Sequence, residues 1–198
     1  MPTDGGGRTD YREFDASGQR WEGERFEGCD FTEAYLDGLV TIGCAFVDCD
    51  FSQADLTNSR HESTQFVAAL FVETRLHEST FVGCKLSGAT FDRIGARGIT
   101  LDGGDFTGMS FGATKLHGQH LSNSRLAEAS LVDTDLTGTD LSGADLRGAR
   151  YGRTVLRDVD LRGAQLDGLD PRQADLRGAH IDLAQAANLI RVFGVIVD

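Results

Sequence analysis

The cysteine and histidine side chains are the ones most able to bind a metal or act as nucleophiles, and their spacing supports neither chemistry. The four cysteines contain no C-x-x-C pair of the kind that zinc sites and redox sites use. All four, Cys29, Cys44, Cys49 and Cys84, fall on a position that a five-residue repeat reserves for small side chains. A thiol at such a position packs as a small buried hydrophobe. We therefore predict no metal site and no cofactor.

The five histidines likewise form no catalytic or metal-binding set. His117 and His120 are three residues apart, but this spacing does not place them on one helical face if the chain turns every five residues, and no adjacent carboxylate completes a ligand set. The chain also lacks a Walker loop, a nucleophile elbow and a dinucleotide-binding fingerprint. We predict that the protein is not an enzyme.

Composition and charge narrow the kind of partner. The 198 residues carry a formal net charge of −12, which argues against direct binding to nucleic acid or to an anionic membrane, because phosphate groups attract basic surfaces. No apolar run approaches the roughly 18 residues that span a bilayer, and residues 1–15 are Gly-rich and mixed in charge, unlike a signal sequence. We expect a soluble, cytoplasmic protein of one domain with a basic partner. The 25 glycines are too many for a helical bundle.

The dominant feature of the sequence is a repeat with a period of five residues. Stepping by five from Trp21 to Ile181 gives 33 central positions, of which 29 are Leu, Phe, Trp, Tyr or Ile. Two residues before these positions, 25 of 32 side chains are small, and two residues after them Gly recurs. This period fits neither an α-helix nor a β-strand. It predicts a chain that turns a corner every five residues, with one large and one small side chain inside, which is a solenoid.

The phenylalanines indicate how many corners make one turn. Sorting the central positions by every fourth repeat places Phe26, Phe46, Phe66 and Phe106 in one column, and a second column holds Phe31, Phe51, Phe71, Phe91 and Phe111. Sorting by every third repeat scatters the same residues. We therefore predict a 20-residue coil with four faces, in which like side chains stack from coil to coil.

These residues resemble the pentapeptide repeat family, whose pattern is A(D/N)LXX. The clearest copies are Thr139-Asp140-Leu141-Ser142-Gly143 and Ala144-Asp145-Leu146-Arg147-Gly148. The resemblance implies an all-β solenoid, a right-handed quadrilateral β-helix of about eight 20-residue coils. We expect a flexible N-terminal tail over 1–20, the β-helix over 21–182, and a C-terminal helical cap and dimerisation segment over 183–198.

Within the family, the chain resembles the members that confer fluoroquinolone resistance. The unbroken register, the stretch over 129–136 and the tail over 181–198 carry this resemblance, and no insertion supplies the projecting loops of the plasmid-borne members. The resemblance implies a homodimer joined through the C-terminal ends that binds DNA gyrase as a mimic of duplex DNA, inhibiting the enzyme or protecting it from a drug or toxin. The alternative is an adaptor solenoid that binds another protein and has no role at gyrase.

The C-terminal residues read as a cap. Asp182 can N-cap a helix from about Leu183 to Phe193, and Gly194 can end it. The apolar residues that follow are more than one short helix needs, so they form either a cap alone or a cap that is also the dimer interface implied by the family. The candidate interface residues are Leu189, Ile190, Val192, Phe193, Val195 and Ile196.

Three departures from the repeat predict local changes of structure rather than chemistry. Thr41 and His61 are one coil apart, so a polar pair is expected inside the first coils, either hydrogen-bonded or turned outward. Pro171 lacks a backbone donor at a central position and favours a kink. Ile94, Ala96 and Ile99 exchange large and small sizes, which favours repacking or a bulge.

The acidic surface is the candidate binding site. Over two adjacent faces of the first three coils, seven acids against Arg25 alone give a charge of −6. A rod of eight coils would be about 39 Å long and a tail-to-tail dimer about 80 Å, whereas 39 Å of duplex DNA carries about 23 charges. The rod's −10 therefore permits only local mimicry of DNA, and the acids could instead serve solubility alone. The candidate contact residues are Glu24, Glu27, Asp30, Glu33, Asp48, Asp50 and Glu73, with Asp133, Asp135 and Asp140 further along the rod.

Overall fold

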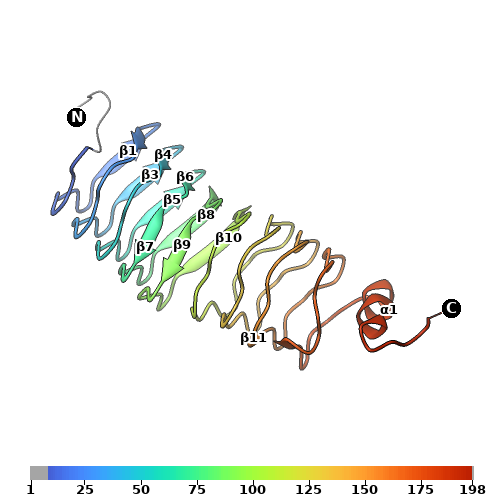
Figure 1. Cartoon of the computed structure of the whole chain (residues 1–198). Helices are drawn as coiled ribbons and strands as arrows, with labels where there is room; N and C mark the ends of the chain where they lie inside the picture. Colours follow the sequence, from blue (N-terminus) through green and yellow to red (C-terminus); the bar gives the residue numbers. More distant parts are fainter. Residues whose placement is uncertain (1–8, 198) are drawn as a thin grey trace.

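The computed structural model describes residues 9–197 and shows a parallel β-solenoid with a short helix at its C-terminal end (Figure 1). Each residue of one turn pairs with the residue twenty positions later, as in Phe26↔Phe46 and Phe46↔Phe66. The 20-residue coil expected from the phenylalanine columns is therefore confirmed. Among the described residues, no helix is long and apolar enough to cross a membrane.

Short strands stack into parallel ladders along the rod. One ladder joins β1 (Arg20–Glu22), β3 (Val40–Ile42), β5 (Arg60–Glu62), β8 (Thr80–Lys85) and β10 (Thr100–Asp105). On the next face, β2 (Arg25–Glu27), β4 (Ala45–Val47) and β6 (Gln65–Val67) stack and reach β8 through the pair Gln65↔Lys85. Two further pairs are β7 (Leu70–Val72) with β9 (Thr90–Asp92), and β11 (Thr154–Val155) with β12 (Ala174–Asp175). Isolated parallel bridges continue the same register elsewhere, except at Asp102↔His120, where the partners are eighteen residues apart.

The core consists of the predicted columns of large side chains. Phe26 and Phe46 stack with ring centroids 5.0 Å apart and an interplanar angle of 3°, and Phe31 and Phe51 have the same geometry. The rings follow the ladder because parallel strands in register place identical positions one above the other. Toward the C-terminal coils leucine replaces phenylalanine at the buried central positions.

The corner residue lies two positions after a central residue and adopts a left-handed backbone, except at Ala113 and Gln173, which lie beside the two irregular parts of the rod. Gly138 and Gly143 have φ values of +70° and +67°, and fifteen non-glycine residues between Glu13 and Asp158 share this conformation at the same position of the repeat. Glycine recurs there because it reaches positive φ without the clash between Cβ and the backbone that other residues incur.

The polar pair inside the first coils is hydrogen-bonded rather than turned outward. Thr41 Oγ1 lies 2.7 Å from His61 Nδ1 and 3.0 Å from Thr64 Oγ1, while His61 Nε2 lies 2.9 Å from Ser59 Oγ. His61 is fully buried, and burial lowers its pKa to about 3, so the ring stays neutral.

The expected N-terminal tail is wrong for residues 9–20, which already form part of the rod. Tyr11 is buried and stacks on Phe31 with centroids 4.7 Å apart, and Ala16 is fully buried at the next central position. The Tyr11 amide donates to the carbonyl oxygen of Asp30 at 2.7 Å. The repeat is hard to recognise here because the central position holds the small side chain of Ala16, where most other repeats have a large one. The remainder of the expected tail, 1–8, lies outside the described residues.

Two of the predicted departures interrupt the ladder. In the regular ladder, the amide of a central residue donates to a carbonyl of the next coil, as from Leu131 to Arg150 at 2.9 Å. The equivalent bond from Tyr151 to Asp170, which precedes Pro171, is missing. The ladder also opens between Ala96 and Lys115, where Ile94 and Ala96 exchange sizes. Both breaks lie where the repeat departs from its own pattern.

Candidate protein-binding surfaces

The cysteines and histidines form no reactive site. All four cysteines are buried and unpaired, and burial raises the pKa of Cys49 and of Cys84 to about 12, which keeps them as thiols. Within residues 9–197, no three His, Cys, Asp or Glu side chains come together as a metal site would require.

The aspartate that precedes many central residues is fixed by the backbone. Its Oδ1 atom accepts a hydrogen bond from the amide two residues later, as in Asp30 with Thr32 at 3.0 Å and Asp50 with Ser52 at 2.9 Å. This local bond is an Asx turn, and it orients each carboxylate in the same way. The second oxygen, Oδ2, is left for other partners.

An acidic face forms at the N-terminal end of the rod. We use this name for Asp10, Glu13, Asp30, Glu33 and Asp50, which lie on the face whose buried centres are Tyr11, Phe31 and Phe51. Asp10, Asp30 and Asp50 are consecutive partners in one ladder, so their carboxylates form a row with a spacing of about 4.8 Å. Arg12 is the cation on this part of the face, with Nη2 2.6 Å from Asp10 and Nε 3.9 Å from Asp30. The acidic face thus carries a net charge of −4 from five acids and one arginine.

The structure brings together some of the predicted acidic residues and separates others. Asp30, Glu33 and Asp50 share the acidic face, and Asp48 is exposed on the neighbouring corner. Glu24 occupies a small, inward position of the repeat and is half-buried, so it does not belong to this surface. Glu27 and Glu73 are exposed but are held by Arg25 at 3.4 Å and Arg93 at 2.7 Å.

Asp10 and Glu13 belong to the acidic face but were missed by sequence reasoning. Both lie in the residues that were expected to be a tail. A signal for them existed, because Asp10 precedes Tyr11 as the repeat requires, but Ala16 interrupts the pattern before Trp21.

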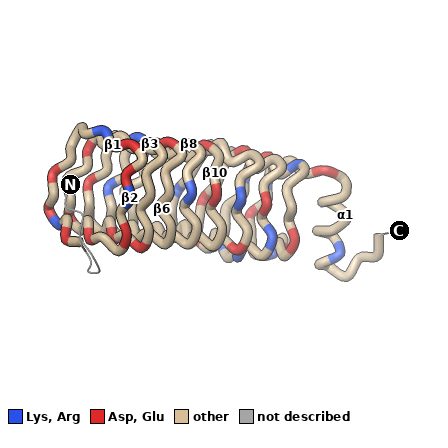
Figure 2. Tube along the Cα trace, turned by 90° about the horizontal axis from the view of Figure 1, so that it is seen from above, with Lys and Arg blue, Asp and Glu red and all other residues tan. Residues whose placement is uncertain are grey.

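Arginines neutralise the same aspartate positions in the C-terminal half. Arg147, Arg162, Arg172 and Arg177 each follow a ladder aspartate by two residues and bind its free oxygen at distances of 2.5 to 2.8 Å. Hydrogen bonds from the arginine side chain and backbone lower the pKa of Asp160 and of Asp170 to about 2. Acidic and basic residues are interspersed along the rod (Figure 2). Asp30 and Asp50 differ because Thr32 and Ser52 follow them, whereas Asp10 is paired with Arg12 in the same way as the later aspartates.

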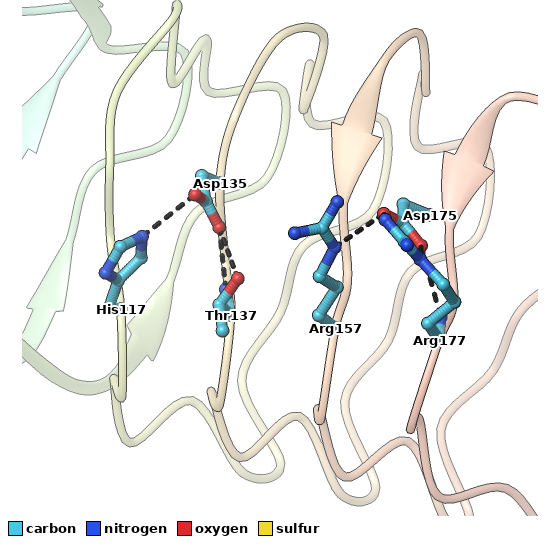
Figure 3. A network of polar contacts seen from close by, with 6 residues as sticks. All are labelled: His117, Asp135, Thr137, Arg157, Asp175 and Arg177. Carbon is cyan, nitrogen blue, oxygen red and sulfur yellow. Dashed lines mark hydrogen bonds and ion pairs between the residues drawn. The ribbon is translucent and has the colours of Figure 1, made fainter.

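Two of the three later predicted acids are also paired with basic side chains. Arg153 holds Asp133 with two bonds of 2.6 and 2.5 Å. Figure 3 shows His117, which lies 2.9 Å from Asp135. Burial raises the pKa of Asp135, but hydrogen bonds from Thr137 and His117 outweigh this effect and lower it. Asp140 accepts from Ser142 and forms no ion pair among the described residues. The three residues do not join the acidic face.

The C-terminal end presents an apolar surface. Helix α1 (Leu183–Arg191) begins at Asp182, which forms a capping box with Gln185, and ends two residues before the expected Phe193. Gln185 fastens the helix to the last coil, since its Nε2 donates to the carbonyls of Leu161 at 2.6 Å and Ala164 at 2.8 Å. The predicted interface residues Ile190, Val192, Phe193, Val195 and Ile196 are exposed, with Ile196 at 85%. Leu189 instead packs against the core, and Leu183, 89% exposed, was missed because it was assigned only to the start of the helix.

The stacked five-residue repeat is similar to that of the pentapeptide repeat family. The family model for pentapeptide repeats matches residues 114–150 and 154–191, with 8 copies. The chain resembles the pentapeptide repeat protein MfpA of Mycobacterium tuberculosis, with 41% identity over 104 residues, which are 52% of this chain and 57% of that protein. It therefore spans little more than half the length of this curated relative.

A solved structure shows the same architecture over nearly the whole chain. Full-length QnrB1, a plasmid-mediated fluoroquinolone resistance protein, matches with a TM-score of 0.79 and 25% identity, covering 95% of this chain and 97% of QnrB1. The family resemblance expected from the repeat is confirmed.

Proposed function

We propose that this protein binds DNA gyrase as a rod-shaped mimic of duplex DNA, and that it inhibits the enzyme or protects it from fluoroquinolones or another topoisomerase poison. Its resemblance to MfpA and to a fluoroquinolone resistance protein supports this proposal. The observation that carries it is the acidic face, where Asp10, Asp30 and Asp50 form a regular row of backbone-fixed carboxylates. Such a row can meet the arginines and lysines of a DNA-binding surface in the cytoplasm without ordering mobile side chains.

The charge of the rod limits how it can imitate DNA. The whole chain carries a net charge of −12. Duplex DNA carries roughly one negative charge per 1.7 Å, which is about 23 charges over the 39 Å expected for the rod. Mimicry therefore depends on shape and on the acidic face, and the binding should weaken steeply as salt screens the carboxylates. This chain acts by binding and not by catalysis in this proposal.

A supercoiling assay with two matched triple variants tests the proposal. The first, Asp30→Asn/Glu33→Gln/Asp50→Asn, removes three charges from the acidic face, while asparagine keeps the Oδ1 atom that accepts the backbone bond. The control, Glu128→Gln/Asp158→Asn/Asp167→Asn, removes three charges from exposed acids in the C-terminal half that form no ion pair within the described part of the chain.

We expect the wild-type protein to alter gyrase supercoiling with and without a fluoroquinolone. The acidic-face variant should need at least a tenfold higher concentration for half its effect, and the control should stay within twofold of wild type. If the pure wild-type protein neither changes supercoiling nor binds gyrase at low salt, the gyrase proposal is wrong and the adaptor alternative stands.

We also propose that two copies associate through their C-terminal ends. The support is the cluster of exposed apolar side chains at α1 and beyond it, including Phe193 at 59% and Ile196 at 85% exposure. A two-fold pairing would cover the same patch on both copies.

A further inference from the structure

Between residues 94–99 and 113–119 the ladder opens on one face of the rod. On either side of this gap the bonds are regular, with the Leu76 amide donating to the Gly95 carbonyl at 2.8 Å and the Leu116 amide to Asp135 at 2.7 Å. The equivalent bond from Ala96 to Lys115 is absent, as are those from Gly98 to His117 and from Lys115 back to Ile94. Three amide donors are therefore released into one opening.

The sequence explains why the coils separate here. Ile94 is too large for its inward position, and Ala96 is too small for the central position that Leu76 and Leu116 occupy in the adjacent coils. Inside the rod, the Gln119 side chain bridges the adjoining part of the ladder, where it accepts from the Leu101 amide at 2.6 Å and donates to the carbonyls of Ile99 at 3.2 Å and His117 at 3.0 Å. What remains outside is a groove of about 620 Å³.

The groove has a cationic rim and an apolar floor. Arg97 and Lys115 line it and form no ion pair with any acid in the described part of the chain, while Ile94, Ala96 and Ile99 supply the apolar surface. This differs from Arg147, Arg162, Arg172 and Arg177, each of which binds the aspartate two residues before it.

Two histidines border the groove. His117 is held by Asp135 at 2.9 Å, and His77 lies so close over Gly95 that a Cβ there would come within 2.8 Å of its Nε2 atom. The Nδ1 atom of His77 is buried and has no hydrogen-bond partner. Glu78, whose carboxylate packs against Gly98, and Asp135, which holds His117, are acids beside the groove, so an anion would be attracted by the local position of Arg97 and Lys115 and not by a net positive charge.

We propose that this groove binds a compact organic anion, with its charged group between Arg97, Lys115 and the amides of Ala96, Gly98 and Lys115, and its apolar part on Ile94, Ala96 and Ile99. Ladder amides point along the rod axis toward the neighbouring coil, so all three face the opening. Each broken bond also releases a carbonyl, including those of Ile94 and Lys115, so the preference for an anion comes from Arg97 and Lys115 beside the unpaired amides. The volume lies in the range of small-molecule sites. The site is independent of the acidic face and of gyrase.

Amide NMR spectra of the full chain test the site, with 2-naphthoate as the probe. Neutral 2-naphthamide lacks the charge, and inorganic phosphate lacks the apolar ring system, so comparison with 2-naphthoate gives the contribution of each. We expect saturable binding of 2-naphthoate with downfield shifts of the Ala96, Gly98 and Lys115 amide protons, and at least tenfold weaker binding of the other two compounds.

Two variants and a matched control separate a built site from general charge attraction. Ile94→Ala/Ala96→Leu restores the small and large order of the repeat and should close the groove, while Arg97→Ala/Lys115→Ala removes its cations. Each should weaken 2-naphthoate binding at least tenfold. The control Lys85→Ala/Arg150→Ala removes one lysine and one arginine, both exposed and unpaired within the described residues, from other faces and should stay within twofold of wild type. Equal binding by wild type and Arg97→Ala/Lys115→Ala, or binding of phosphate as tight as that of 2-naphthoate, would overturn the proposal.

Discussion

At the corners of the rod, single residues carry a conformational cost that the repeat normally avoids with glycine. Ala68 has a φ of +53° and, unlike the asparagine and aspartate at other corners, no polar side chain to compensate. An L-residue in this region costs about 1–2 kcal/mol, and glycine loses about 0.5–1 kcal/mol of backbone entropy on folding. We predict that Ala68→Gly stabilises the protein by roughly 0.5–1 kcal/mol, raising the melting temperature by a few degrees.

The neighbouring alanine provides the control for this prediction. Ala69 is fully buried at an inward position and does not have positive φ, so Ala69→Gly should lower the melting temperature. Thermal unfolding monitored by circular dichroism measures both changes. A lower melting temperature for Ala68→Gly would show that its methyl group packs more favourably than its backbone is strained.

His61 makes the stability of the rod depend on pH. Its pKa is about 3 in the folded chain against an ordinary 6.5, so between these values the unfolded chain binds a proton that the folded chain does not. The contribution of neutral His61 to the free energy of unfolding is fully present above about pH 6.5. It falls as the pH decreases toward 3, by up to about 1.4 kcal/mol per pH unit. We predict that His61→Phe, which continues the column toward Phe81, loses this part of the pH dependence in urea unfolding at pH 5 and pH 7. An identical slope for wild type and variant would contradict it.

Among the elements, α1 depends on one side chain for its attachment. Removing the Gln185 amide would leave the carbonyls of Leu161 and Ala164 without donors and would also end the capping box. Each unsatisfied buried group costs about 1–3 kcal/mol. We predict that Gln185→Ala accelerates amide hydrogen exchange in α1 at least tenfold and leaves β3 and β5 unchanged, because coils interact only with their neighbours. Gln165→Ala, the same change at an exposed residue, should leave α1 protected.

Most of the rod could be predicted from the sequence because its period is strict. The columns of phenylalanine and leucine followed directly from spacing, since register fixes which side chains stack. The coil over 9–20 could not be predicted in the same way, because Ala16 conceals the step between Tyr11 and Trp21. The opening at Ala96 was anticipated as a repacking, but the release of three amides depends on how far the coils separate, which spacing does not determine.

The candidate site was predicted less completely than the fold. Counting charges located the excess of acid near the N-terminus, but it could not distinguish Asp50, whose second oxygen is free, from Asp133, which Arg153 holds. Ser52, two residues after Asp50, leaves that carboxylate available, whereas Asp133 is neutralised by an arginine twenty residues later, where side-chain placement in the next coil decides the pairing. Glu24 was misplaced for another reason, because its position in the repeat points inward.

At the scale of the whole molecule, the acidic face belongs to the N-terminal end of the rod and the apolar surface to its C-terminal end, and these ends lie opposite one another (Figure 1). Pairing at the C-terminal ends would place one acidic face at each extremity of a dimer about 80 Å long. Two such faces on one particle can bind a two-fold symmetric partner together, and the second contact then forms at high effective concentration. Dimerisation should therefore contribute to activity even though the apolar surface touches only the second copy.

We predict that Phe193→Asp/Ile196→Asp halves the mass in solution, because charges at 59% and 85% exposed positions would be buried against one another in a two-fold interface. Light scattering measures the mass, and the same samples enter the supercoiling assay, where the monomer should need at least a tenfold higher concentration. Tyr35→Asp/Leu70→Asp, which charges two exposed apolar residues of the first coils, should leave the mass unchanged. If the Phe193→Asp/Ile196→Asp variant keeps the wild-type mass, the apolar end is only a cap; if it becomes monomeric with full activity, a single acidic face is sufficient for gyrase.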